Sequence, residues 1–313
     1  MYTAFAGKHP DSRWTVTIIC VAYLIAIQLF TGLRIENIAL AAGYCLLIWI
    51  TPQTRSFALA FAIFIVFGLS YDLMKYWPNY LFREVDISRL YFFEKSLFGI
   101  TTDGITQTPN EYLALVSNKF LDFLCGLIYL NWVPVPLAYA VYLYFKKREV
   151  YLDYGLAFLL VNFIGFAGYY IHPAAPPWYI ELHGFQFIAD TSGNAAGLSR
   201  FDNLIGVPVF SAIYSKNSNV FAALPSLHCA YPVVMLYYGI RNNHKGIRSV
   251  ISVLMILFMA GIWFSAVYSW HHYVVDVILG VLCAIAGLII YEVLLLKSSW
   301  FVKFKLKYYV LIK

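Results

Sequence analysis

Long apolar runs and short polar turns alternate along the chain, and this pattern predicts helices that cross a membrane. A helix needs roughly 20 apolar residues to span about 30 Å of hydrocarbon, and most of the runs reach this length. The second and third are shorter, so the pattern leaves open whether both cross. Pro134 and Pro136 predict a kink or an early end within the fourth run. The eight runs lie at about 14–33, 37–51, 56–73, 120–145, 152–171, 221–240, 248–269 and 273–296. The expected fold is an all-α, polytopic membrane bundle of six to eight transmembrane helices.

Composition excludes several other classes of protein. Of the 313 residues, 61% are hydrophobic and 12% are charged, which is about half the usual charged share of roughly 25%. A soluble fold could not cover this much apolar surface, so a disordered chain, a coiled coil and a soluble enzyme are excluded. No basic tract with interleaved aromatic residues occurs, so we expect no nucleic-acid partner. The cysteines lie in or beside apolar runs without a CxxC pair, which favours buried thiols over a disulfide frame or a metal cage.

Lysine and arginine residues indicate which side of the membrane each loop faces. The sequence KKR at 146–148 forms one basic turn, and a second cluster of basic residues occupies 241–248. Cytoplasmic loops are enriched in such residues, so we place both turns and the N-terminus inside. The long polar segments at about 74–119 and 172–220 then lie outside, together with the starts of the sixth and eighth runs.

The eighth run begins with HHYVVDV, in which His272 and Asp276 are spaced i, i+4. Residues at this spacing share a helix face, and an aspartate one turn into a membrane helix is costly unless it has a partner. A carboxylate bonded to one imidazole nitrogen fixes the tautomer and leaves the other nitrogen free to attack. The pair is therefore a candidate nucleophile with its orienting acid, although a His–Asp pair that only joins two helices fits the same spacing.

The sixth run begins with ALPSLHCAYP. Pro225 suits the first turn of a helix, and the free N–H groups there, with Ser226, make an anion site. His228 follows; taken alone it fits a buried core histidine, just as Pro225 and Ser226 fit ordinary helix initiation. Both histidine-bearing helix starts, however, fall on the same side of the membrane. Two imidazoles, an aspartate and a helix N-terminus suit in-line phosphoryl transfer, in which one histidine attacks phosphorus and the other protonates the leaving oxygen.

These residues resemble the second and third motifs of the type 2 phosphatidic acid phosphatase superfamily. PSLH occupies 225–228, and Ser265, His272 and Asp276 stand in the spacing Ser-x6-His-x3-Asp. Longer segments are similar to the inositol phosphorylceramide synthase branch, and the resemblance covers about 150–296. Those segments are HPAAPPWY at 172–179, GLSRFDNLIGVPVF at 197–210, NVFAALPSLHCAYP at 219–232 and HHYVVD at 271–276.

The resemblance implies a role for each motif residue. His272 becomes a phosphohistidine, Asp276 orients it, and His228 acts first as acid and then as base. Ser226 and Ser265 are implied to bind phosphate. The resemblance implies no cofactor and no metal, although the ligand types of the histidines and the aspartate would also suit a metal ion.

The chain departs from the phosphatase pattern at two phosphate-binding cations. The first motif, Lys-x6-Arg-Pro, is absent, and Ala266 stands where an arginine usually follows the serine. Arg200, oriented by Asp202, is our first candidate to replace them, and Lys216 is the second; a solvated loop charge would explain Arg200 nearly as well. The missing cations disfavour a plain phosphatase and agree with the synthase branch.

We therefore expect a phosphotransferase that moves a phosphoalcohol, phosphoinositol by resemblance, from a phospholipid donor to a ceramide-like acceptor and releases diacylglycerol. The same site would serve a lipid phosphate or pyrophosphate phosphatase with water as acceptor. A transporter or scaffold is a third class, which the absence of an internal repeat disfavours.

The resemblance also implies how the chain is organised. We expect N-terminal membrane helices at 1–55, a catalytic membrane domain with a six-helix core typical of the superfamily at 56–297, and a basic cytoplasmic tail at 298–313. The site would face the extracytoplasmic side of a bacterial plasma membrane or a Golgi-type membrane. The oligomeric state and the role of the segment 74–119 stay open.

Overall fold

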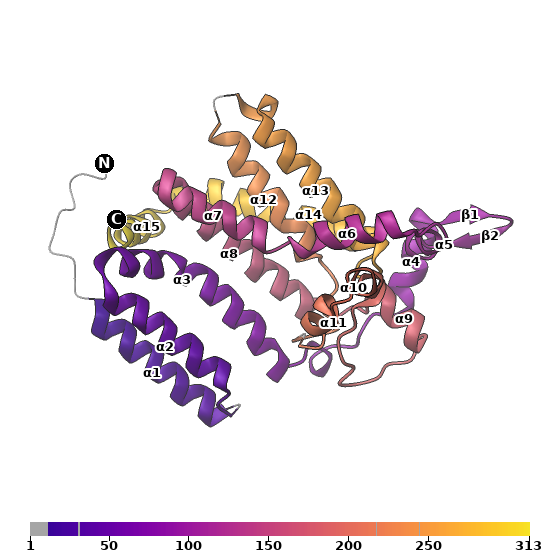
Figure 1. Cartoon of the computed structure of the whole chain (residues 1–313), viewed down its shortest axis with the longest axis horizontal. Helices are drawn as coiled ribbons and strands as arrows, with labels where there is room; N and C mark the ends of the chain where they lie inside the picture. The colour runs from indigo at the N-terminus through magenta and orange to yellow at the C-terminus, as the bar shows by residue number, and fades with distance from the viewer. Residues whose placement is uncertain (1–11, 31, 217, 244) are drawn as a thin grey trace.

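The structure, a computed structural model, describes residues 12–30, 32–216, 218–243 and 245–313, and most of them are helical (Figure 1). Each apolar run forms a helix or a pair of helices where the sequence predicts one. The long helices are α1 (Ser12–Phe30), α2 (Ile35–Ile50), α3 (Pro52–Leu73), α6 (Lys119–Leu130), α7 (Pro134–Lys146), α8 (Arg148–Ile171), α12 (Leu227–Arg241), α13 (Val250–Tyr268) and α14 (Val274–Ile289), which continues through a π-turn at Ile290–Leu294 and a 3-10 turn at Leu295–Lys297.

Five of the described helices are long and apolar enough to cross a membrane, or six if α6 and α7 count as one bent span. The prediction of a helical membrane bundle is confirmed. Helices α2 and α12, with 16 and 15 residues, are shorter than the roughly 20 residues that a span needs. The predicted kink is also confirmed, because the fourth run breaks after Leu130 and restarts at Pro134 with a bend of 41°.

Helix α12 lies at the centre of the bundle, packed against α8, α13 and α14. Two glycines allow the residues directly before its first turn to approach the neighbouring helices closely; these are the N-cap Ser226 and Pro225, which therefore precedes the helix instead of lying in its first turn. A Cβ at Gly280 of α14 would lie 2.2 Å from the Ser226 carbonyl oxygen, and one at Gly168 of α8 would lie 2.7 Å from Pro225 Cδ. Any larger residue at either position would displace the start of α12. These contacts therefore fix the position of the helix start that carries His228.

The two ends of the bundle differ in their connections. The short basic turns between α7 and α8 and between α12 and α13 lie at the same end as the C-terminal helix α15 (Ser299–Ile312). The opposite end, at the right of Figure 1, carries the two long polar segments, which fold into short elements. These elements are α4 (Ser88–Phe98), β1 (Ile100–Thr102), β2 (Ile105–Gln107), α5 (Pro109–Leu115), α9 (Pro177–His183), α10 (Ser199–Ile205) and α11 (Val209–Tyr214).

Backbone and side-chain bonds join the two long segments into one cap. Ala174 pairs in parallel with Asp86 on one side and with Ala222 on the other. The buried Asn79 donates from Nδ2 to the carbonyl oxygens of Tyr169 and Phe221, both at 2.8 Å. The cap therefore holds the starts of α12 and α14 in one frame, and both predicted histidines lie at those starts.

Candidate active site

A tight turn between α13 and α14 sets the position of His272. Trp270 has φ +65°, in the left-handed region, and the N–H groups of His271 and His272 both donate to the Ala266 carbonyl at 3.1 Å. The chain reverses direction here, so His272 lies directly before the first turn of α14.

His272 and Asp276 form the pair that their spacing predicts. Nδ1 of His272 lies 3.4 Å from Oδ2 of Asp276, and the two residues are 4% and 0% exposed. The same carboxylate oxygen accepts from the Tyr273 N–H at 2.9 Å. The separation between the ring and the carboxylate is long for a hydrogen bond, and such contacts commonly tighten when substrate binds.

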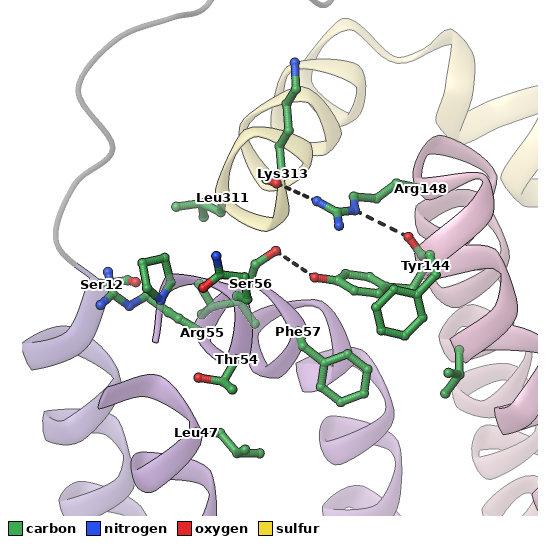
Figure 2. Close-up of a pocket in the computed structure, with 15 residues that line it drawn as sticks. Ser12, Leu47, Thr54, Arg55, Ser56, Phe57, Tyr144, Arg148, Leu311 and Lys313 are labelled. Carbon is green, nitrogen blue, oxygen red and sulfur yellow. Dashed lines mark hydrogen bonds between the residues drawn. The ribbon is translucent and has the colours of Figure 1, made fainter. Parts of the chain in front are cut away.

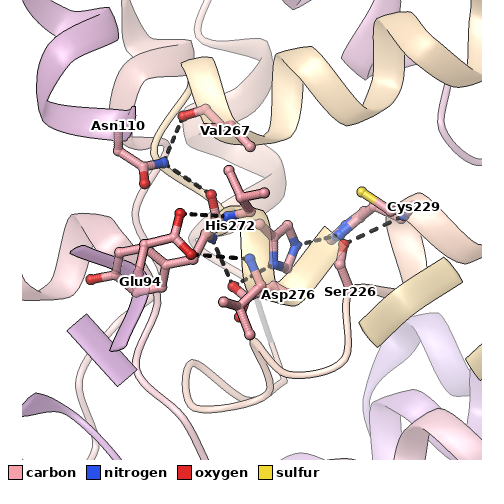
Figure 3. Close-up of polar contacts among 11 residues, drawn as sticks. Glu94, Asn110, Ser226, Cys229, Val267, His272 and Asp276 are labelled. Carbon is pink, nitrogen blue, oxygen red and sulfur yellow. Dashed lines mark hydrogen bonds and ion pairs between the residues drawn. The ribbon is translucent and has the colours of Figure 1, made fainter. Parts of the chain in front are cut away.

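His228, the second residue of α12, completes a line of three polar side chains. Its Nδ1 lies 3.0 Å from Nε2 of His272, and the Trp132 ring packs edge-on against it with 4.1 Å between centroids. Figure 3 shows the His272 ring between Asp276 and the start of α12. With a proton on Nδ1 facing Asp276, Nε2 of His272 carries the lone pair and accepts from His228, a proton placement that follows from the hydrogen-bond pattern.

Burial keeps the nucleophile candidate neutral. Desolvation lowers the pKa of His272 to about 3, because water is excluded from the charged form of the ring. A neutral imidazole has a free lone pair at neutral pH, as attack on phosphorus requires.

Both imidazoles open into a cavity of about 180 Å³. Its polar lining includes Lys216 and Asn219, and most of the remaining wall is aromatic or aliphatic. An apolar pocket with a few convergent polar groups is typical of a ligand site. The apolar residues come from α3, α8, α9, α11 and α12, from the turn between α6 and α7 and from the loops before α9 and α12: Phe67, Tyr71, Trp132, Phe166, Tyr169, Pro176, Trp178, Ile213, Tyr214, Val220, Ala222, Ala223, Leu227 and Tyr231.

The two predicted serines lie near the histidines but outside the lining described for this cavity. Ser226 is the N-cap of α12; its Oγ accepts from the Cys229 N–H at 3.4 Å, and its own N–H donates to the Asp276 carbonyl at 3.0 Å. Ser265 is fully buried within α13. Phosphate binding by either serine stays a prediction. In this structure Ser226 caps α12 and joins its start to α14.

The two predicted cations lie in different surroundings. Arg200 donates from Nε to Asp122 Oδ1 at 2.6 Å, and its guanidinium lies over the Tyr268 ring, 5.0 Å from the centroid. The expected pairing with Asp202 is wrong, because that carboxylate caps α11 by accepting from the N–H groups of residues 210 and 211. Lys216 is exposed and lines the cavity, which places it closer to the chemistry than Arg200.

His271 also lines this cavity, but its hydrogen bond is to neither His272 nor His228. Its Nε2 bonds the Ala195 carbonyl oxygen at 3.1 Å, and its ring stacks on Tyr214 with 4.2 Å between centroids. Burial lowers its pKa to about 3. Within the described parts of the chain, no three His, Cys, Asp or Glu side chains are grouped as a metal site would need.

Two buried residues of the first polar segment reach the His272 turn, and sequence reasoning did not single them out. Glu94 of α4 bonds the first N–H groups of α14, and Asn110 of α5 bonds the His272 carbonyl (Figure 3). Glu94 stands in the stretch YFFEK, where a carboxylate directly after three aromatic residues is the only signal that could have marked it.

A second cavity, of about 750 Å³, lies at the other end of the bundle (Figure 2). Arg55 and Arg148 line it, and Arg148 donates to the Ile312 carbonyl at 2.9 Å. None of the described histidines lines it, so His272 and His228 belong to the smaller cavity.

Comparison with known proteins supplies the family. The model of the PAP2 superfamily matches residues 106–290. The phosphoinositol dihydroceramide synthase of Bacteroides thetaiotaomicron is 47% identical over 307 residues, which are 97% of this chain and all of that protein. The inositol phosphorylceramide synthase of Candida albicans and the catalytic subunit of the Saccharomyces cerevisiae enzyme are each 30% identical, over 89% and 76% of this chain. These matches span 58% and 57% of the two fungal proteins. No solved structure matched.

Proposed function

The chain belongs to the PAP2 superfamily, and on this premise we propose that it moves a phosphoinositol head group from a phospholipid to a ceramide-like lipid through a phosphohistidine at His272. The observation that carries the proposal is the buried line Asp276–His272–His228, with 3.0 Å between the facing nitrogens of the two imidazoles. The relatives are a phosphoinositol dihydroceramide synthase and an inositol phosphorylceramide synthase, and this supports the choice of lipids.

In the first half-reaction, Nε2 of His272 attacks phosphorus as the bond from phosphorus to the diacylglycerol oxygen breaks. With the anionic phosphodiester bound beside it, His228 is in its imidazolium form; it gives one proton to that oxygen and becomes neutral, so diacylglycerol leaves as a neutral alcohol. Asp276 accepts a hydrogen bond from the Nδ1–H of His272 and stabilises the positive charge that the ring gains. The head group is then held on His272 by a P–N bond.

In the second half-reaction, a primary hydroxyl of the acceptor lipid gives its proton to His228 and its oxygen attacks phosphorus. The P–N bond breaks, which returns His272 to its neutral form and His228 to its starting protonation state. One proton and one phosphoryl group therefore pass through the site in each turnover.

The walls of the cavity favour a lipid acceptor over water. They are mostly aromatic and aliphatic, so an acyl or sphingoid chain can bury its surface there and displace solvent. A phosphatase would instead need a water molecule beside the phosphohistidine, and the apolar lining gives such a molecule few partners.

We propose that the site faces the extracytoplasmic side of the membrane. Asp276, His272 and His228 lie at the end of the bundle with the long loops, while the basic turns at 146–148 and 241–248 lie at the opposite end. Cytoplasmic loops carry the excess of basic residues. An accessibility probe on a cysteine introduced into either end would test this assignment.

The products distinguish the synthase from the phosphatase. Purified protein given phosphatidylinositol with a labelled inositol should form one labelled ceramide-bearing lipid, and diacylglycerol should appear in equal amount. Without ceramide, turnover should stop after about one equivalent of diacylglycerol per protein. Continuous release of water-soluble inositol phosphate at the same rate with and without ceramide would instead identify water as the acceptor.

We further propose that Lys216, and not Arg200, supplies positive charge to the phosphate. Lys216→Met should lower kcat/KM for the phospholipid donor by roughly 10- to 100-fold, because a charge-assisted hydrogen bond contributes about 1.5–3 kcal/mol. Steady-state kinetics in mixed micelles measure this loss.

Arg200→Met is the matched comparison. It leaves the partly buried Asp122 carboxylate without its guanidinium, so we expect a lower melting temperature and an almost unchanged rate per folded molecule. The opposite pattern, with Arg200→Met impaired in kcat/KM and Lys216→Met normal, would return the phosphate-binding role to Arg200.

A further inference from the structure

The N-terminus of α14, which carries the catalytic pair, is capped by a carboxylate from a distant part of the chain. Oε1 and Oε2 of Glu94 accept from the N–H groups of Val274 and Val275 at 2.9 and 3.0 Å (Figure 3). The N-cap residue Tyr273 makes no capping bond with its own side chain. The first N–H groups of a helix need partners when buried, and a negative charge there is favoured by the helix dipole.

A second contact holds the other side of the same turn. Nδ2 of the buried Asn110 donates to the Val267 carbonyl at 2.7 Å and to the His272 carbonyl at 2.9 Å. Val267 belongs to the last turn of α13, so this one amide ties the end of α13 to the catalytic histidine. Asn110 thus bonds the carbonyl group of the His272–Tyr273 peptide, and Glu94 bonds the N–H groups of the two residues that follow Tyr273.

Neither residue is part of the described lining of the catalytic cavity. Their contacts act on the backbone from which His272 and Asp276 project. Burial raises the pKa of the Glu94 carboxyl to about 7, the two N–H bonds oppose this shift, and the nearby Asp276 adds to it. A buried acid beside another buried acid is a costly way to cap a helix, and polar N-cap side chains such as Ser or Asp do so without that cost.

We propose that Glu94 and Asn110 are positioning residues that hold His272 in line for attack on phosphorus. The segment 74–119 is then part of the active-site framework. This inference rests on the proposed function of His272 and adds to it, because it assigns a task to a segment in which the sequence shows no motif.

The test separates positioning from folding by comparing kcat with KM. Glu94→Gln keeps the size of the side chain but removes the charge and one of the two acceptor oxygens. We expect it to lower kcat by about 10- to 100-fold, since a misplacement of about 1 Å can cost roughly 10²-fold in rate, and to leave KM for the phospholipid donor within about 3-fold. Glu94→Asp, which keeps the charge on a shorter side chain, should recover part of the lost kcat.

Asn110→Ala should lower kcat in the same way, again with a small change in KM. The matched control is Glu84→Gln, which makes the same chemical change at an exposed position of the same segment and should keep the wild-type kcat. All rates are taken per folded molecule, from the monodisperse fraction in size-exclusion chromatography, with melting temperatures measured in parallel.

A purely structural role would lower the melting temperature or yield of the Glu94 and Asn110 variants and leave kcat per folded molecule at the wild-type value, which would overturn the inference. If Glu94→Gln does not fold, the Glu94→Asp and Asn110→Ala values decide in the same way. Failure of the wild-type protein to transfer phosphoinositol would overturn the proposed function and this inference with it. Active wild-type protein with unimpaired variants would overturn the inference alone.

Discussion

Replacing His272 by alanine should reduce phosphoinositol transfer by about 10⁴-fold or more, the scale on which the loss of a nucleophile acts. Nε2 of this ring is the only atom proposed to bond phosphorus, and an alanine side chain would offer no lone pair in its place. The ring is 4% exposed and held between Asp276 and His228. Transfer of labelled inositol from phosphatidylinositol to ceramide measures the loss. The wild-type protein should also carry labelled head group on His272 through an acid-labile P–N bond, and the variant should carry none.

The matched control is His183→Ala, the same substitution at a partly exposed histidine that ends α9 and lies tilted against the Tyr179 ring with 4.9 Å between centroids. It should keep the wild-type rate. The melting temperature of the His272 variant reports whether the cap has stayed folded. A folded His272→Ala protein that still transfers phosphoinositol at the wild-type rate would refute the covalent mechanism.

Much of the fold follows from one-dimensional patterns. Apolar runs predict the long helices because the cost of unpaired backbone groups in hydrocarbon leaves helices as the favoured structure for such runs. Pro134 predicts the break between α6 and α7, because proline has no N–H to donate and its ring would clash with the carbonyl group four residues earlier in a continuous helix. The short elements of the long polar segments could not be predicted in this way. The helices α4 and α5 and the hairpin between them lie in 74–119, where polar and aromatic residues are mixed without a clear period.

In the candidate site too, contacts between residues close in sequence could be predicted, and contacts between distant segments could not. His272 and Asp276 are four residues apart, so a shared helix face predicts that they meet; they do meet, although His272 lies two residues before α14 and not on the helix itself. Side-chain partners that are far apart in sequence could not be found in this way. Arg200 reaches back 78 residues to Asp122, and Glu94 reaches forward 180 residues to the start of α14. Such contacts depend on how helices pack in three dimensions, and the spacing within one segment contains no information about them.

His228 carries the second large prediction. His228→Ala should slow transfer from phosphatidylinositol by about 10²- to 10⁴-fold, the range for removal of a general acid. Without a proton donor, the diacylglycerol oxygen must leave as an alkoxide. His272 keeps its lone pair and its bond to Asp276, so the site still attacks phosphorus, but the departure of the poor leaving group becomes limiting.

A donor that needs no protonation should restore the first half-reaction selectively. We expect His228→Ala to release nitrophenol from a nitrophenyl ester of phosphoinositol at a rate within about 10-fold of wild type, since nitrophenolate leaves without a proton. His272→Ala should show no such rescue. Rapid-quench measurement of nitrophenol against time gives the burst that reports formation of the P–N bond.

The second half-reaction would then stall, because the same residue must remove the proton from the acceptor hydroxyl. With the activated donor and ceramide both present, the His228 variant should therefore accumulate head group on His272, while the wild-type protein passes it on. Intact-mass spectrometry of the quenched protein measures that adduct. An equally large loss with the activated and the natural donor would mean that His228 holds the substrate or the histidine turn in place, through contacts such as the 3.0 Å one between the two rings, and does not transfer the proton.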